Sequence, residues 1–336
     1  MSSSSGTNGN GHGRLPLEVI EMRFPQPVEA PVRRPRKRPL WPAVLLLLLT
    51  VVSTLAVGSE FAISYSQNRE PFSGPDPYAR MFAPFENPRL LVLGVPFSFT
   101  LLTILMAHEL GHFFACRIYG IDASYPYFIP APTLFGTFGA FIRIRSPITT
   151  RRALFDVGLS GPVVGFVLAA PAMAFAVATS KVVPGATADA NILFGIPPLM
   201  RGLIALFHPG IDPQWLLLNP IGRAAWVGLF ATALNLLPAW QLDGGHILYS
   251  VANKFHQRIS LTVALALLGI GIEGHGYRGV TWILWGGLLT ILSLRFRHPP
   301  LYDPWEPLDA SRRAWAIVAL LIFAFSFTLW PATQLQ

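Results

Sequence analysis

The 336-residue chain has very little cysteine and very little charge. Its single cysteine, Cys116, excludes an intramolecular disulfide, so disulfides do not staple this fold. Only 12% of the residues are charged, 52% are hydrophobic, and the mean hydropathy is +0.48. This composition excludes an ordinary pair of soluble domains and is typical of a polytopic membrane protein.

The formal net charge of +8 does not indicate nucleic-acid binding, because the basic residues cluster in the N-terminal tail and in loops. Residues 1–39 are rich in Ser, Gly and Asn, then in Pro and Arg, and predict a disordered tail with a basic anchor. The apolar run that follows lacks a clear small-residue cleavage site, which favours a retained anchor over a signal peptide.

Seven apolar segments predict membrane spans, at about 40–58, 89–119, 155–180, 222–240, 259–275, 279–295 and 314–331. With the tail placed in the cytoplasm, the inner segments hold Arg143, Arg145, Arg151, Arg152, Lys254, Arg258, Arg295, Arg297, Arg312 and Arg313. The outer segments hold fewer basic residues over longer stretches: Arg69, Arg80, Arg89, Lys181, Arg201, Arg223 and Arg278. This bias favours an all-α polytopic membrane protein with its N-terminus inside and its C-terminus outside.

The segment 120–154 differs from the spans, because it is rich in proline, glycine and aromatic residues. Its stretch 136–145 alternates with a period of two, which indicates a strand or hairpin. Since a bilayer does not accept a lipid-exposed sheet edge, we expect a re-entrant or interfacial β-hairpin-like segment near 125–146.

The second predicted span contains the pattern H-E-x-x-H at His108, Glu109 and His112. On a helix the two histidines lie on one face, about 6 Å apart along the axis, where one tetrahedral Zn²⁺ can bind both. Glu109 follows the first ligand directly, where it can act as a general base. Each ionisable side chain costs roughly 2.5–3.5 kcal/mol at the centre of a bilayer, which favours a site over a polar cluster without metal.

A catalytic zinc needs a third protein ligand, and Asp243 is the best candidate, because it ends an apolar span at the same predicted depth. The alternative is that Asp243 caps a short helix beginning at Gly244. His246 is a competing ligand, and Cys116 lies one turn after His112, where packing between helices is the more ordinary role. Asn235 lies two turns before Asp243 and can either hydrogen-bond the substrate or a reaction intermediate, or join two helices.

These motifs together resemble the site-2 protease family of intramembrane zinc metalloproteases. The likeness rests on His108-Glu109-Leu110-Gly111-His112, on Asn235-Leu236-Leu237-Pro238 with Leu242-Asp243-Gly244, and on Ser160-Gly161-Pro162 followed by Gly165. It covers about residues 89–250, and the chain is most similar to the compact branch without a PDZ domain, found in bacteria and plastids. Together with the predicted spans, this divides the chain into a tail (1–39), a first span with its outer loop (40–88), a catalytic core of three spans (89–250) and three additional spans (251–336).

The resemblance implies one Zn²⁺ bound by His108, His112 and Asp243, with Glu109 as the general base and Asn235 assisting the substrate or intermediate. It also implies that the strand-like segment, with Gly139, Ala140, Phe141 and Ile142, pairs with an unwound substrate. The expected partners are transmembrane protein substrates and the lipid bilayer, in a bacterial plasma membrane or alternatively a plastid membrane. Two other classes stay open: a catalytically inactive membrane scaffold, and a metal-binding protein of the transporter type.

Overall fold

The computed structural model describes residues 39–73, 79–187, 190–274, 276–299, 301 and 307–333. The contacts within the chain divide it into two units, Met1–Pro39 and Leu40–Gln336. The predicted disordered tail lies outside the described residues, apart from Pro39.

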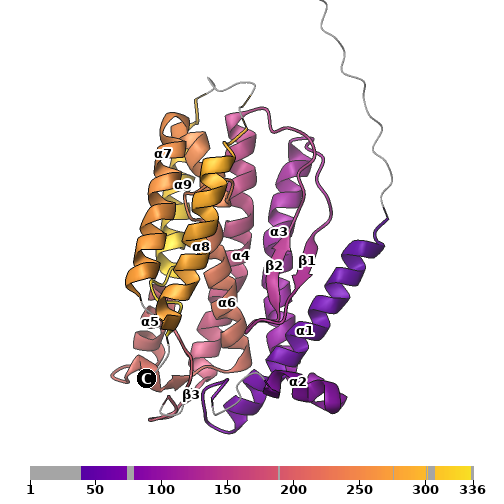
Figure 1. Cartoon of the computed structure of the whole chain (residues 1–336), viewed down its shortest axis with the longest axis vertical. Helices are drawn as coiled ribbons and strands as arrows, with labels where there is room; N and C mark the ends of the chain where they lie inside the picture. The colour runs from indigo at the N-terminus through magenta and orange to yellow at the C-terminus, as the bar shows by residue number, and fades with distance from the viewer. Residues whose placement is uncertain are drawn as a thin grey trace, which may run out of the picture. The chain divides into compact units, whose positions relative to one another are not determined.

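The described part of the chain is mostly helical, as predicted (Figure 1). The helices are α1 (Trp41–Ser66), α2 (Ala79–Glu86), the 3-10 helix η1 (Pro88–Gly94), α3 (Val95–Ile118), α4 (Arg151–Thr179), α5 (Pro198–Phe207), the 3-10 helix η2 (Pro213–Trp215), α6 (Pro220–Asn235), α7 (Asp243–Glu273), α8 (Gly276–Arg295) and α9 (Ala310–Ser326). Short strands connect them: β1 (Tyr127–Pro130), β2 (Thr137–Phe141), β3 (Lys181–Val182), β4 (Leu193–Phe194), β5 (Leu216–Leu217) and β6 (Ala332–Thr333).

Among the described residues, four helical segments are long and apolar enough to cross a membrane: Trp41–Ser66, Pro88–Ile118, Arg151–Thr179 and Asp243–Glu273. The other predicted spans, 222–240, 279–295 and 314–331, correspond to α6, α8 and α9. Helices α6 and α9 have only 16 and 17 residues, fewer than the roughly 20 that cross a hydrocarbon core. A total of seven spans therefore stays a prediction.

Helix α7 is longer than the predicted span 259–275, because it already begins at Asp243. Its backbone leaves the helical region at Ala252, with φ −139° and ψ 55°. Beyond this kink the chain returns: the Ser260 hydroxyl accepts from the Trp240 N–H, and the His256 ring hydrogen-bonds the Trp240 carbonyl. His256, which lies between the predicted spans 222–240 and 259–275, is therefore helical and buried.

Strands β1 and β2 form an antiparallel hairpin that pairs Tyr127 with Phe141 and Phe128 with Ala140. The alternating stretch thus contains a strand, as expected, and the hairpin lies beside α1 and α3 (Figure 1). The Ser53 hydroxyl of α1 donates to the Gly136 carbonyl at 2.6 Å and fixes the turn of the hairpin on the helix. Its predicted position at the membrane interface stays a prediction.

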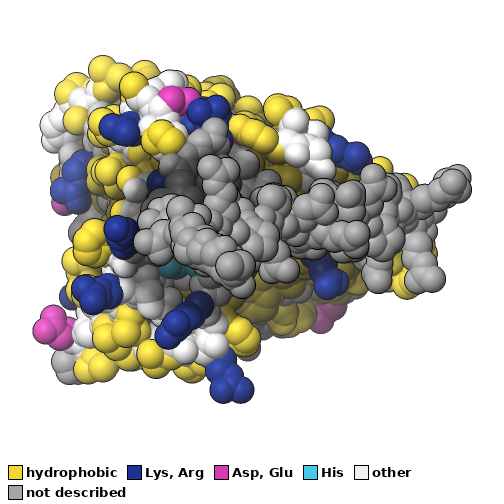
Figure 2. All heavy atoms as spheres, turned by 90° about the horizontal axis from the view of Figure 1, so that it is seen from above, with side chains coloured by type: hydrophobic (Ala, Val, Ile, Leu, Met, Phe, Trp, Pro, Cys, Tyr) yellow, Lys and Arg dark blue, Asp and Glu magenta, His cyan; other side chains and the backbone are white. Residues whose placement is uncertain are grey.

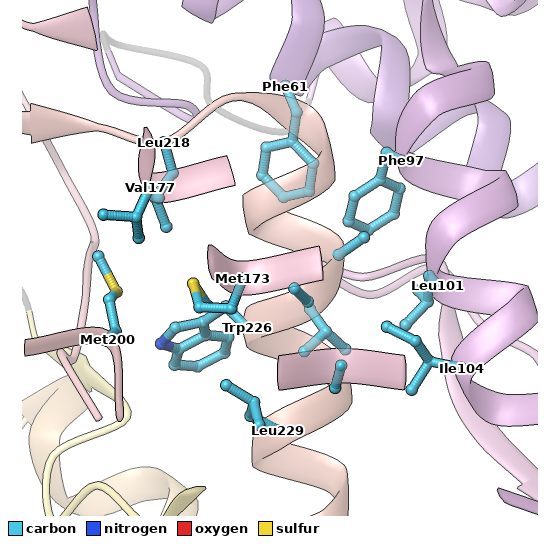
Figure 3. Close-up of a cluster of buried hydrophobic side chains, with 14 of the residues drawn as sticks. Phe61, Phe97, Leu101, Ile104, Met173, Val177, Met200, Leu218, Trp226 and Leu229 are labelled. Carbon is cyan, nitrogen blue, oxygen red and sulfur yellow. The ribbon is translucent and has the colours of Figure 1, made fainter. Parts of the chain in front are cut away.

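The main hydrophobic core joins α1, α3, α4 and α6 (Figure 3). Phe61 of α1 and Phe97 of α3 pack with ring centroids 4.8 Å apart, and Trp226 of α6 belongs to the same cluster and lies near Met173 and Leu229. Among helices that cross a membrane, close packing of such side chains provides the attraction, so this cluster holds α3 against α4 and α6.

At the opposite end of α6 from Asn235, a buried ion pair connects that helix to the segment after α1. Arg223 Nη2 donates to Glu70 Oε2 at 2.6 Å, and both side chains are buried, with exposures of 7% and 6%. Removing one partner of a buried pair leaves the other charge uncompensated, at a cost of about 3–5 kcal/mol.

We predict that Arg223→Met and Glu70→Gln each lower the thermal unfolding temperature of the purified protein clearly, and that the double variant recovers part of the loss, because it buries no lone charge. Thermal unfolding in one detergent measures all three. Wild-type stability in both single variants would contradict a stabilising pair.

Candidate metal centre and active site

Helix α3 presents His108, Glu109 and His112 to the interior of the bundle, with exposures of only 5%, 6% and 6%. Because His108 and His112 are four residues apart on this helix, both imidazole rings lie on the face that points toward α4 and the start of α7. The predicted helix and the predicted face are both present.

Asp243 reaches the same place from a tight turn between α6 and α7. Helix α6 ends at Asn235, and α7 begins at Asp243 with Leu242 as its N-cap. A Cβ on Gly244 would lie 2.1 Å from the Leu236 carbonyl oxygen, and one on Gly245 would lie 2.4 Å from that of Trp240. Only glycine fits this turn, so the Gly-Gly pair lets the chain bring Asp243 to the histidines.

The carboxylate does not act as the helix cap that the sequence left open, because Leu242 holds that position. Instead Asp243 Oδ2 lies 3.3 Å from His108 Nε2 and 3.3 Å from His112 Nε2. The two Nε2 atoms are 3.1 Å apart. Within the described part of the chain these three residues make up the group of His, Cys, Asp and Glu side chains that can hold a metal ion.

The dimensions of this triangle fit zinc. A tetrahedral Zn²⁺ with ligand bonds of about 2.0–2.1 Å has its ligand atoms roughly 3.3 Å apart, which agrees with the separations found here. Two imidazoles and one carboxylate are also a donor set that zinc accepts, and three protein ligands leave a fourth position open.

The surroundings prepare the histidines for this role. His112 Nδ1 hydrogen-bonds the Val157 carbonyl at 2.7 Å, which requires the proton on Nδ1 and leaves the Nε2 lone pair for a metal. A Cβ on Gly161 would lie 2.1 Å from His112 Nε2, and a Cβ on Gly165 would lie 3.0 Å from His108 Nδ1. The two glycines of α4 therefore make room for the two imidazole rings.

A small cavity of about 100 Å³ adjoins the cluster and collects several predicted site residues. His108 and Glu109 line it from α3, Asn235 from α6, and Gly139 and Ala140 from β2. The Asn235 Nδ2 atom lies 3.2 Å from His108 Nε2. Residues separated by more than a hundred positions in sequence thus border one space.

The other two predicted strand residues lie beside this cavity. Phe141 pairs with Tyr127 in the hairpin and is 45% exposed. The backbone N–H of Ile142 hydrogen-bonds the Glu109 carboxyl, while its side chain packs among Ala115, Cys116 and their neighbours. The residue that directly follows β2 therefore helps to orient Glu109.

The two competing ligands are not part of the cluster. Cys116 is fully buried among apolar side chains, in the ordinary packing role that the sequence favoured. His246 instead places its Nδ1 3.0 Å from His298 Nε2. Burial lowers the pKa of His298 to about 4, so that ring is neutral near pH 7. No sequence pattern indicated this pair, because 52 residues separate its members.

The sequence also did not predict a hydrogen-bonded network at the end of α3. Arg312 of α9 donates from Nη2 to Asp156 of α4 at 2.6 Å, and the Tyr119 hydroxyl bonds the same carboxylate. Asp156 thus joins α4 to α9 and to the end of α3. No local pattern could have revealed a contact between residues 156 positions apart.

We predict that Gly161→Ala removes most of the bound zinc, because its Cβ would displace the His112 ring by more than an ångström. Elemental analysis of protein purified with zinc in excess measures the metal content. Gly287→Ala is the matched control, since the space around Gly287 is open. Equal zinc in both variants and in wild type would refute the role given to Gly161.

Comparisons with known proteins agree with this geometry. A family model described as peptidase family M50 matches residues 96–272. The protein named "Probable zinc metalloprotease EGY1, chloroplastic" of Oryza sativa subsp. japonica is 30% identical over 320 residues, or 89% of this chain and 52% of that protein. Its namesake in Arabidopsis thaliana is 30% identical over 342 residues, or 95% of this chain and 58% of that protein.

The chain spans about half the length of these curated relatives. The family match extends from the start of α3 almost to the end of α7, which is more than half of the chain, and it includes every member of the cluster. The chain therefore belongs to peptidase family M50, the site-2 protease family that its motifs resemble.

Proposed function

We propose that this protein is an intramembrane zinc metallopeptidase that hydrolyses peptide bonds within or near transmembrane segments of other proteins. One observation carries the proposal: the His-His-Asp cluster and the Glu109 carboxyl lie together, buried, among helices apolar enough to cross a membrane. The family and the names of the relatives support the same activity.

His108, His112 and Asp243 would hold the zinc. Zinc bound there would polarise a peptide carbonyl and make a water molecule acidic enough to be deprotonated near neutral pH. The Val157 carbonyl keeps His112 in the tautomer that this requires.

Glu109 would move the protons of the reaction. As a carboxylate it would accept a proton from the attacking water and then deliver that proton to the nitrogen of the leaving amine. The Ile142 N–H, which contacts the Glu109 carboxyl, would fix its direction.

Asn235 and β2 would position the substrate. A transmembrane helix has its carbonyls hydrogen-bonded internally, so a segment must unwind before cleavage. Because Gly139 and Ala140 border the same cavity as Glu109, a peptide added to the edge of β2 would pass the catalytic carboxylate. The Asn235 amide would donate to the substrate carbonyl or to the oxyanion that forms from it.

The distribution of charge supports a cytoplasmic N-terminus. Figure 2 views the end of the bundle at which α3 finishes and α4 begins, and Lys and Arg side chains stand around this face with few acidic ones. Such an excess is typical of the cytoplasmic side. We propose seven spans in this orientation, in a bacterial plasma membrane or in a plastid membrane, the latter supported by the chloroplast names of the relatives.

The alternative classes explain fewer features. A metal transporter needs ligands along a path, whereas the described residues hold one cluster at one depth. An inactive scaffold does not need a buried carboxyl beside that cluster, yet Glu109 is there.

We predict that Glu109→Gln keeps its zinc and loses cleavage, because the amide is isosteric but cannot accept the proton. General acid–base catalysis contributes about 10²–10⁴ in rate, so the loss should be at least about a hundredfold. Wild type and variant are purified in detergent, assayed for zinc and incubated with a panel of single-span model substrates.

Cleavage of the same substrate by Glu109→Gln at the wild-type rate would overturn the assignment of Glu109. If neither protein binds zinc after reconstitution, the metallopeptidase is wrong and the scaffold becomes the better reading.

We further predict that Ala140→Pro slows cleavage about tenfold or more while zinc content is unchanged, because proline removes an N–H and disturbs the strand that receives the peptide. Ala140→Ser keeps the N–H and serves as the control. Equal cleavage by the two variants would refute pairing of the substrate with β2.

A further inference from the structure

A second cavity, far larger than the one beside Glu109, lies at the opposite end of α6. Its volume is about 900 Å³, within the range of ligand-binding pockets. No residue lines both cavities: on α6, Arg223 and Trp226 line the large one, whereas Gly228 and the residues after it line the small one. The large cavity is therefore separate from the proposed catalytic site.

The charged part of the lining of this cavity is mostly cationic. Three arginines and one glutamate contribute to it: Arg201, Arg223, Arg278 and Glu70. Glu70 already pairs with Arg223, whereas Arg201 and Arg278 are exposed and have no hydrogen-bond or ion-pair partner among the residues that the structure describes. The guanidinium groups of Arg201 and Arg278 are thus unpaired among the described residues, and the charged lining of the cavity has a net positive charge.

Apart from Thr187, Gln214, Thr328 and Thr333, the rest of the lining is apolar, and part of it is aromatic. Phe194 of β4, Trp226 of α6 and Trp330 near the C-terminus all line the cavity. These walls are fixed in advance: Trp226 Nε1 donates to the Gly195 carbonyl at 2.6 Å, and Phe194 of β4 pairs with Ala332 of β6. A ligand that fits must therefore combine an anion with an apolar portion.

The position of the cavity indicates where such a ligand comes from. Glu70 follows α1, a candidate membrane span, by four residues. Helix α5 and the C-terminal end of the described chain lie at the same end of the bundle, at the bottom of Figure 1. Arginine and tryptophan side chains at the ends of membrane helices lie at the level of lipid headgroups.

We propose that this cavity binds an anionic phospholipid, whose phosphate contacts Arg201 and Arg278 and whose acyl chain lies against the aromatic walls. Arginine forks match phosphate oxygens in a bidentate manner, and the phosphate would supply the partner that both guanidinium groups lack. The lipid would join β4, α5, the N-terminal part of α8 and the C-terminal segment, and so stabilise the end of the bundle away from the cluster.

The test compares lipid binding by the full chain and by Arg201→Gln/Arg278→Gln. Both side chains are exposed, so these substitutions do not disturb the core. The control Arg89→Gln/Arg313→Gln removes the same charge from exposed positions outside the cavity. Delipidated protein in detergent is titrated with phosphatidylglycerol, phosphatidylcholine or inorganic phosphate, and bound lipid is counted by native mass spectrometry while thermal stability is recorded.

We expect wild type and control to bind one phosphatidylglycerol with a gain in unfolding temperature, and the double variant to bind it about tenfold more weakly or worse. Phosphatidylcholine should bind weakly to all three proteins. Equal binding of the two lipids, or an unchanged affinity in the double variant, would overturn the proposal. Displacement of the lipid by millimolar phosphate would show a site for the free anion and would also overturn it.

Discussion

The structure depends on one constraint: four ionisable side chains must be buried together in an otherwise apolar bundle. His108, His112 and Asp243 meet at separations of 3.1–3.3 Å, and Glu109 is buried beside them. An isolated charge at this position would be costly, so each group needs a partner. The surrounding features follow from that need. The Val157 carbonyl hydrogen-bonds His112, and Gly161 and Gly165 leave space for the two imidazole rings. The turn at Gly244 and Gly245 brings Asp243 next to them.

Much of this arrangement could be predicted, because the signals are local. On a helix, the H-E-x-x-H spacing sets the relative positions of its three functional side chains. Pro238, Gly244 and Gly245 predict the break in the helix near Asp243. The depth match between two spans identified Asp243 as the partner. The alternating stretch 136–145 likewise indicated its strand.

Other parts could not be predicted, because they depend on contacts between distant segments. The return of α7 after Ala252 buries His256, although its sequence reads as a polar segment between spans. Gly161 and Gly165 read as a helix-packing pattern, and only the structure shows that they accommodate imidazole rings. The pairs His246–His298 and Asp156–Arg312 join residues 52 and 156 positions apart, for which one sequence offers no signal.

The most direct test of the account concerns the metal ligands themselves. Zinc K-edge X-ray absorption on the purified full chain resolves the atoms bound to the metal. We expect two imidazole nitrogens and oxygen at about 2.0–2.1 Å, and no sulfur. A sulfur neighbour at about 2.3 Å would place Cys116 in the site, and three imidazoles would place His246 there. Either result would contradict a centre made of His108, His112 and Asp243.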